Sequence, residues 1–278
     1  MKVYGERNIF PNKKFTRIQG YSYKESNQSA NCLFKFMSKL DYLKEIIEKS
    51  SIIPRYYEER IDYLKIKNIK KIAIPMSCFC DIHLKNIALH INNYGSYGIG
   101  IDKGWGISKG IQPILYMNEN SPLRKDFSFS LRTALETKGE VRLKELKNLI
   151  QNQLLFMKPI EGEMLIYQGQ YRECNFHDEK EWRYVPDLNN SKTELRVLTD
   201  QEHMNESVYN HFSNGIRENP KLWLKLKLDA INYLIVKNEE DRIDMINFIR
   251  RLQNVKEEID KDILISKIQV FDSMRGDM

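Results

Sequence analysis

The chain is short of cysteine and has no long apolar run. Only four cysteines occur in 278 residues, too few for the disulfide framework of a small secreted protein. No stretch approaches the roughly 18 to 20 apolar residues of a membrane-spanning helix, and the first residues lack the apolar core of a signal peptide. We therefore expect a cytoplasmic protein with reduced thiols and no membrane partner.

A strong excess of one charge is also missing. The 44 basic and 38 acidic residues leave a net charge of +6, and the basic residues Lys65 and Lys67 follow closely on Glu58 and Glu59. Nucleic-acid-binding proteins usually carry a sharper basic stripe. The charge permits an RNA or DNA target without identifying one, and solvated helix faces are the better explanation of any single lysine cluster.

The residues that are present indicate a folded α+β protein. Hydrophobic residues make up 41% of the chain and charged residues 29%, which is the balance of a globular protein. The length suits one large domain or two small ones. We expect a single α+β domain over residues 31–255 with a helical insertion at about 128–156, preceded by an N-terminal arm at 1–30 and followed by a C-terminal extension at 256–278.

The spacing of apolar residues predicts the elements of this domain. The expected strands are Leu33–Met37, Lys71–Cys80, Pro113–Met117, Met164–Gln168, Glu181–Val185, Leu195–Leu198, Leu222–Lys227 and Ile231–Val236. The expected helices are Lys39–Lys49, His83–Ile91, Leu131–Leu155 with a break at Gly139, and Glu239–Leu252. Ser38, Asp81 and Asn238 are the expected N-caps, and Ile243 is expected on the core side of the last helix. Arg55–Arg60 is expected to be a basic, aromatic loop.

One cluster of metal-ligand residue types occurs at Cys78-Phe79-Cys80-Asp81-Ile82-His83. A second ligand pair at zinc-finger spacing is absent, and cysteine is among the residue types most often buried. His83 and His90 are two helical turns apart, too far to share a metal easily. We therefore expect a core strand here and no metal site.

A glycine-aromatic segment runs from Tyr94 to Ile101. Glycines let backbone amides approach a ligand closely, and aromatic rings stack on bases or on nicotinamide. The segment matches neither the Rossmann fingerprint nor the phosphate-binding loop of nucleotide triphosphatases. Two interpretations stay open, a ligand cleft or a glycine-rich strand against which another part of the chain packs closely.

A second candidate is the charged segment Asp178–Tyr184, which leads into a strand. On that strand Glu181 and Arg183 face one way. Glu181 is a candidate carboxylate for orienting a ribose hydroxyl or stabilising a cationic centre. A Glu–Arg pair on a sheet surface is the plainer alternative, while a nuclease Glu-x-Lys order is missing. His177 lies next to this segment. Together, Ile74–Asn120 and Phe176–Pro186 predict a bipartite site.

Several stretches in order along the chain resemble the AbiGi family of abortive phage-infection proteins. They are Ile74–Ile82, Tyr94–Gly100, Gly110–Asn120, Phe156–Pro159, Asp178–Pro186 and Ile231–Phe248. The resemblance covers roughly residues 33–250. It implies a phage-defence protein, the antitoxin half of a two-gene pair, with a cognate toxin or antitoxin protein as partner.

A more distant resemblance concerns the layout of the first strand, the helix Lys39–Lys49, the glycine-aromatic strand and the late glutamate. This layout is similar to that of DarT-like and other ADP-ribosyltransferases, which implies a split mixed β-sheet with flanking helices around NAD. In that layout Glu181 is the catalytic carboxylate, Tyr97 stacks on nicotinamide and Lys35 stands where related proteins carry histidine. Either Lys35 takes over that role or the pocket has lost NAD chemistry. The residues implied to contact the cofactor are Phe36, Tyr94, Gly95, Ser96, Gly98 and Arg55.

Three functions follow as hypotheses. The first is an ADP-ribosyltransferase-like toxin that uses NAD to modify nucleic acid or protein. The second is a non-catalytic antitoxin that neutralises a partner toxin by direct binding. The third, which the residues favour least, is a metal-dependent nuclease.

Overall fold

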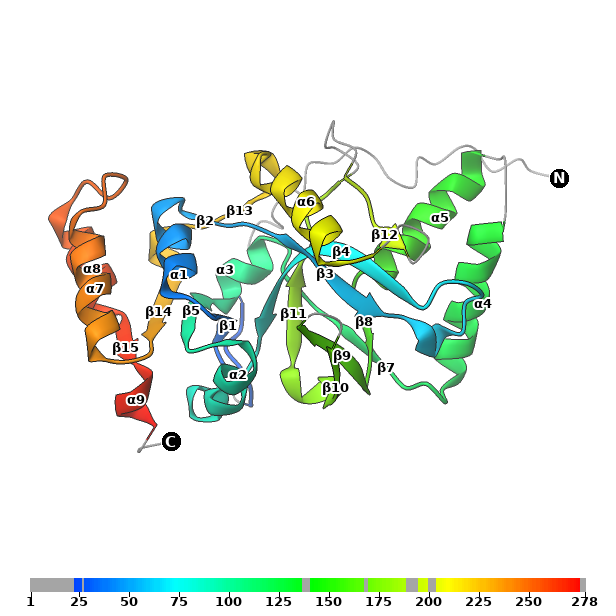
Figure 1. Cartoon of the computed structure of the whole chain (residues 1–278), viewed down its shortest axis with the longest axis horizontal. Helices are drawn as coiled ribbons and strands as arrows, with labels where there is room; N and C mark the ends of the chain where they lie inside the picture. Colours follow the sequence, from blue (N-terminus) through cyan, green and yellow to red (C-terminus); the bar gives the residue numbers. More distant parts are fainter. Residues whose placement is uncertain are drawn as a thin grey trace.

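A nine-stranded mixed sheet runs through the described part of the chain. The computed structural model describes residues 23–26, 28–136, 141–167, 170–188, 195–199 and 204–275. The strand order is β15 (Ile268–Val270), β14 (Ile231–Val236), β5 (Tyr97–Asp102), β1 (Cys32–Met37), β4 (Lys71–Cys80), β11 (Glu181–Tyr184) and β6 (Gln112–Pro113), and β3 (Arg55–Arg60) and β12 (Leu198–Thr199) also pair with β4. The expected α+β class with a mixed sheet and flanking helices is confirmed (Figure 1).

Helices and smaller sheets flank these strands. The α-helices are α1 (Leu40–Glu48), α2 (Ile87–Tyr94), α3 (Lys103–Ser108), α4 (Pro122–Glu136), α5 (Val141–Leu154), α6 (Glu206–Arg217), α7 (Glu239–Arg250), α8 (Glu258–Ser266) and α9 (Phe271–Met274). The two-stranded sheets pair β2 (Ser51–Ile52) with β13 (Leu224–Lys225), β7 (Leu115–Met117) with β8 (Met157–Pro159), and β9 (Glu161–Tyr167) with β10 (Gln170–Asn175). The 3₁₀ turns are η1 (Asp62–Leu64), η2 (Leu84–Asn86), η3 (Phe176–Glu179), η4 (Pro220–Leu222) and η5 (Leu228–Ala230). No helix of the described residues is both long and apolar enough to cross a membrane.

The sheet is nearly divided between β1 and β4. These two strands pair at a single position, where Phe34 lies opposite Cys80. On its other side β1 pairs with β5 along all six of its residues, and β4 pairs with β3 and β11 along their full lengths. Two halves of the sheet are thus joined at one residue pair, and β1 and β4 part beyond it.

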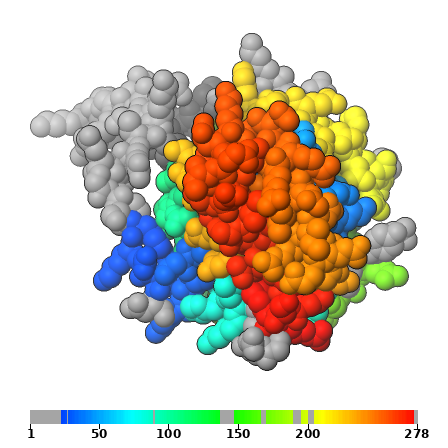
Figure 2. Space-filling model, turned by 90° about the vertical axis from the view of Figure 1, so that its left-hand side faces the viewer, coloured from blue at the N-terminus to red at the C-terminus, as the bar shows by residue number. Residues whose placement is uncertain are grey.

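Each half of the sheet is covered by helices on both faces. Helices α1, α7 and α8 pack on one face of β1, β5 and β14, where Leu33, Ile99, Ile101 and Leu234 are completely buried. Helices α2 and α9 pack on the opposite face. Figure 2 shows α7 and α8 on the outer surface of the half that contains β14 and β15. On the other half, α4 and α5 pack against β4 on one face and α6 packs on β3 and β4 on the other. Burying each large aliphatic side chain contributes about 1.5–3 kcal/mol to stability.

Two glycines of β5 lie beneath aromatic rings of β1. A Cβ atom added to Gly98 would lie 2.9 Å from the Phe36 ring, and one added to Gly100 would lie 2.8 Å from the Phe34 ring. The rings of Phe34 and Phe36 are themselves stacked, with centroids 6.2 Å apart. These glycines leave room for the rings, which agrees with the interpretation of the glycine-aromatic segment as a closely packed strand.

Several expectations for individual elements are wrong. Arg55–Arg60 is not a loop, because it forms β3 and pairs with β4 throughout. Ser38 does not cap α1, since the residue before the helix is Lys39 and provides no side-chain cap. Asp81 does not cap a helix either, because His83 precedes the next turn and Asn86 precedes α2. Its carboxylate accepts a hydrogen bond from Lys103 Nζ at 2.5 Å instead. The expected cap Asn238 is confirmed by its side chain accepting from the Asp241 amide at 2.9 Å.

Other boundaries shift. The single helix expected at His83–Ile91 is a 3₁₀ turn followed by α2, which ends at Tyr94. Ile243 is 59% exposed rather than on the core side of α7, where Met245 is buried instead. The break expected at Gly139 lies outside the described residues, as does most of the expected arm at 1–30. After residue 255 the chain forms α8, β15 and α9, and β15 extends the sheet by parallel pairing with β14.

Candidate functional site

The side chains of Glu181 and Arg183 are buried on the same face of β11. Their alternate positions on the strand place both side chains on one side, and β11 lies between β4 and β6 in the sheet. Glu181 is 5% exposed and Arg183 is fully buried. The plainer alternative for these two residues is a Glu–Arg pair on a sheet surface. The pairing of Glu181 with Arg183 is confirmed, but the surface position is wrong, because the pair is buried inside the protein.

Arg183 is bound by Glu181 on its own strand and by two groups from other parts of the chain. Its Nε donates to Glu181 Oε1 at 2.5 Å, and its Nη2 donates to Glu59 Oε1 on β3 at 3.0 Å. Its Nη1 donates to the carbonyl oxygen of Leu155 at 2.9 Å. Charge-assisted bonds of this kind are the strong ones in proteins, so Arg183 ties β11 to β3 and to the end of α5.

Lys158 on β8 completes the network. Its Nζ lies 3.1 Å from Glu181 Oε2 and 3.3 Å from Glu179 Oε2. The same ammonium group lies 4.2 Å from the centre of the Phe176 ring, within the range of a cation–π interaction. Glu179 also accepts a hydrogen bond from the Tyr94 hydroxyl. The result is a buried cluster of opposite charges that satisfy one another, in which both Glu181 oxygens have cationic partners.

The electrostatics keep this cluster ionised. Burial acts to raise the pKa of the Glu181 carboxyl, but the positive charges of Arg183 and Lys158 outweigh it and hold that pKa well below its usual range. Burial acts to lower the pKa of Lys158, and the nearby charges of Glu181 and Glu59 hold it well above its usual range instead. A carboxylate with so low a pKa does not serve as a general base near neutral pH.

The acid sensitivity of folding should therefore depend on Glu181. A carboxyl with a lowered folded-state pKa contributes its full stability above the unfolded pKa of about 4.3 and loses it as the pH falls below that value. We expect the free energy of unfolding to fall by about 1.4 kcal/mol per pH unit from this group alone below about pH 4. The Glu181→Gln variant should lack this part of the slope in urea unfolding between pH 5 and pH 3.

The slopes of stability against pH are the quantity to compare, because Glu181→Gln also removes one of the two carboxylate partners of Arg183 and lowers stability at every pH. Glu218→Gln is the matched control, since Glu218 is exposed at the end of α6. This control should keep the wild-type slope. If Glu181→Gln keeps it as well, the Glu181 carboxyl does not have a lowered pKa.

A cleft of about 870 Å³ opens beside this network. Most of its lining comes from β1, β3, β4, α2, the β9–β10 hairpin and α6, and the network contributes Lys158, Glu179 and Glu181. The cleft therefore lies where β1 and β4 part. Five of the residues predicted from the sequence line it, namely Lys35, Phe36, Arg55, Tyr94 and Glu181. The structure thus brings the early lysine, two aromatic rings and the late glutamate to one cavity.

The other predicted site residues do not line the cleft. Tyr97 lies on the face of β5 that packs against α1 and α7, and its hydroxyl donates to Asp241 on α7 at 3.1 Å. A ligand in the cleft would therefore not meet the Tyr97 ring. Gly95 has a φ of +113° and follows the end of α2. Neither Gly95, Ser96 nor Gly98 is among the lining residues.

Sequence reasoning missed several residues around Glu181. Lys158, Glu59 and Glu179 form its ionic surroundings. The hydroxyl oxygen of Tyr116 accepts a hydrogen bond from the Glu181 amide at 2.7 Å. Glu179 shares the acidic segment with Glu181 and was within reach of sequence reasoning, whereas no local pattern singles out Lys158 or Glu59.

The residue types considered for a metal site are placed as follows. Cys80 is buried, and its Sγ donates to the Phe34 carbonyl at 3.4 Å. Burial raises the pKa of the Cys78 thiol well above its usual range, which keeps it protonated. His177 is exposed and packs edge-on against the Tyr116 ring, with centroids 5.1 Å apart. Within the described ranges, no three His, Cys, Asp or Glu side chains gather in a way that would hold a metal ion.

The sequence matches a family of phage-resistance proteins. The family described as "Putative abortive phage resistance protein AbiGi, antitoxin" matches residues 50–237. The "Abortive phage resistance protein AbiGi" of Lactococcus lactis subsp. cremoris is 33% identical over 247 residues, which cover 82% of this chain and 99% of the relative. The chain belongs to the AbiGi family. No solved structure matches it.

The AbiGi family match covers the ionic network but not the whole cleft. Glu59, Lys158, Glu179, Glu181 and Arg183 all lie within residues 50–237. Strand β1, which carries Lys35 and Phe36, precedes the matched range. The matched residues of this AbiGi chain therefore include the half of the sheet that contains β3, β4 and β11, which Arg183 connects. From the other half they include α2, β5 and β14.

Proposed function

We propose that this AbiGi protein is a non-catalytic antitoxin of an abortive phage-infection system, which neutralises a partner toxin by direct binding. The observation that carries the proposal is the enclosure of the Glu181 carboxylate by Arg183 and Lys158. The antitoxin description of the matching family supports the same conclusion.

The enclosure of Glu181 opposes catalysis for a physical reason. A glutamate that contacts a ribose hydroxyl, or stabilises a cationic centre, needs a free lone pair and an uncompensated negative charge. Both oxygens of Glu181 accept charge-assisted hydrogen bonds, with donors at 2.5 to 3.3 Å. Breaking one such bond costs about 1.5–3 kcal/mol, and losing Glu181 would reduce the carboxylate partners of the buried Arg183 from two to one, Glu59. The network therefore supports a structural role for Glu181.

The second candidate is an ADP-ribosyltransferase-like enzyme that uses NAD, and the cleft favours it. Its volume of about 870 Å³ lies within the range of small-molecule sites. Lys35 and Arg55 would bind the pyrophosphate, and Phe36 and Tyr94 offer rings for stacking. These residues fit a dinucleotide, and the near division of the sheet at β1 and β4 fits the split-sheet layout. The enclosed Glu181 does not fit the chemistry, so NAD transfer ranks second.

Two measurements test the antitoxin proposal. Expressed alone, the chain should leave growth unchanged, and co-expressed with the toxin encoded beside it, the chain should restore growth to the level of an empty vector. The purified chain should retain that toxin on a column. Incubated with labelled NAD and cell extract, it should transfer no label under conditions in which a known transferase does. Growth arrest that Glu181→Gln abolishes, or label transfer by the purified chain, would overturn the proposal in favour of the enzyme.

A further inference from the structure

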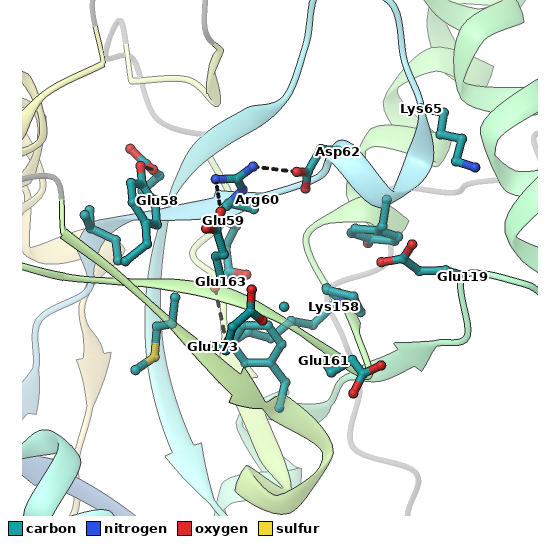
Figure 3. Close-up of a pocket in the computed structure, with 17 residues that line it drawn as sticks. Glu58, Glu59, Arg60, Asp62, Lys65, Glu119, Lys158, Glu161, Glu163 and Glu173 are labelled. Atoms are coloured by element: carbon teal, nitrogen blue, oxygen red, sulfur yellow. Dashed lines mark hydrogen bonds and ion pairs between the residues drawn. The ribbon is translucent and has the colours of Figure 1, made fainter.

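A second pocket adjoins the cleft and shares lining residues of β3, β8 and the β9–β10 hairpin with it. Its volume is about 320 Å³, and its lining comes from β3, η1, the loop after β7, β8, the β9–β10 hairpin and η3. Figure 3 shows Glu58 and Glu119 at opposite sides of this pocket. Acidic side chains outnumber basic ones in the lining.

Part of this negative charge has no partner in the ion pairs between the residues that the structure describes. Arg60 pairs with Asp62 and Glu163, and Glu58 and Glu59 pair with Lys71 and Arg183. Lys158 also lines the pocket and pairs with Glu179 and Glu181. The remaining pocket carboxylates are Glu119, Glu161 and Glu173, and the remaining lining cation is Lys65. An excess of negative charge therefore faces the pocket.

The hydroxyl group of Tyr63 is a second and independent sign of a missing ligand. Tyr63 lines the pocket and is only 4% exposed. Its hydroxyl oxygen is buried and has no hydrogen-bond partner among the described residues. Burial raises the pKa of this hydroxyl, the negative charge of Glu59 raises it further, and the positive charge of Arg183 acts against both. A buried hydroxyl without a partner is costly, and a ligand N–H would satisfy its oxygen.

We propose that this pocket binds an organic cation, a guanidinium or alkylammonium group. Glu119 and Glu161 would accept its N–H donors, the Tyr63 oxygen would accept one more, and the Tyr171 and Phe176 rings of the lining would contact its apolar part. A metal ion is disfavoured, because the described acidic residues do not gather closely enough to hold one. A pocket at the lower end of the size range for ligand sites suits a single arginine side chain or one end of a polyamine.

Isothermal titration calorimetry on the full chain tests this site. The probes are N-acetyl-L-arginine amide, its neutral isostere N-acetyl-L-citrulline amide, and spermidine. We expect both cations to bind and citrulline not to bind. Tighter binding of the arginine derivative indicates that a partner protein's side chain is the natural occupant, and tighter binding of spermidine indicates a free polyamine. Binding should weaken as the salt concentration rises.

The variants are chosen to separate the pocket from general surface charge. Glu119→Gln combined with Glu161→Gln should weaken cation binding by about tenfold or more, whereas Glu218→Gln, an exposed glutamate outside the pocket, should leave it unchanged. Tyr63→Phe should weaken binding while keeping or raising the melting temperature, since it removes a buried hydroxyl that has no partner among the described residues.

The proposal fails if neither cation binds, if citrulline binds equally well, or if Glu218→Gln has the same effect as the pocket variants. Because binding is measured on the chain alone, the result stands apart from the antitoxin test.

Discussion

Replacing Arg183 with methionine is expected to lower the free energy of unfolding by about 3–5 kcal/mol. Arg183 is completely buried, and its loss would remove the donor from Glu59 Oε1 and from the Leu155 carbonyl and leave Glu181 bound to Lys158 without Arg183. A buried charge that loses its partner carries the full cost of desolvation. For a domain of this size the melting temperature should fall by roughly 10 °C, measured by circular dichroism or differential scanning calorimetry.

The control is Arg242→Met, which removes an arginine whose partner Glu239 is 61% exposed. An exposed pair of this kind contributes about 0–1 kcal/mol, so the melting temperature should hardly change. The double variant Arg183→Met with Glu181→Leu should recover part of the lost stability, because a buried ion pair can be replaced by apolar groups at small cost. An Arg183→Met protein as stable as Arg242→Met would show that the network does not stabilise the fold.

Replacing Gly95 with alanine should lower the free energy of unfolding by about 3 kcal/mol or more. A Cβ atom at this position would lie 2.3 Å from the Met37 carbonyl oxygen, and the φ of +113° is one that residues with side chains rarely adopt. The clash is with backbone, so no side-chain rotation relieves it. Since Met37 ends β1, the new methyl group would push β1 away from the end of α2. Urea unfolding with a linear extrapolation measures the loss.

Gly110→Ala separates the two causes. Gly110 has a φ of +79°, and a Cβ atom there would meet nothing within 4 Å. This variant carries only the cost of the left-handed backbone, about 1–2 kcal/mol. The difference between the two variants isolates the backbone clash at Gly95. Equal losses would mean that α2 and β1 shift apart at little cost.

Local sequence patterns predict the elements but not their partners. Alternation places Glu181 and Arg183 on one face of a strand, and the side chain of Asn238 caps α7 as its residue type suggests. Lys158, however, meets Glu181 from 23 positions away, and Glu59 meets Arg183 from 124 positions away. Contacts at such separations depend on the order of strands in the sheet, which no local period encodes.

The misplaced site residues have a similar cause. Tyr94 and Tyr97 look equivalent in the sequence, yet Tyr94 lines the cleft while Tyr97 bonds to α7. Tyr94 is the last residue of α2, whereas Tyr97 begins β5 and lies on the face of that strand that α7 covers. Ser38 was a plausible cap only if α1 began at Lys39, and the helix begins one residue later. Local propensity therefore predicts that an element exists, and tertiary packing decides which way its side chains face.

The position of β5 in the sheet has a consequence for how the chain is made. Strand β5 ends at Asp102 and its outer neighbour β14 begins at Ile231, so the ribosome adds 231 − 102 = 129 residues before that edge can be covered. At roughly 5–20 residues per second this takes on the order of ten seconds. Throughout that interval a nascent chain presents an uncovered strand edge, the kind of surface that joins one unfinished chain to another. A lower translation rate between β5 and β14 would prolong this exposure and favour aggregation on the polysome.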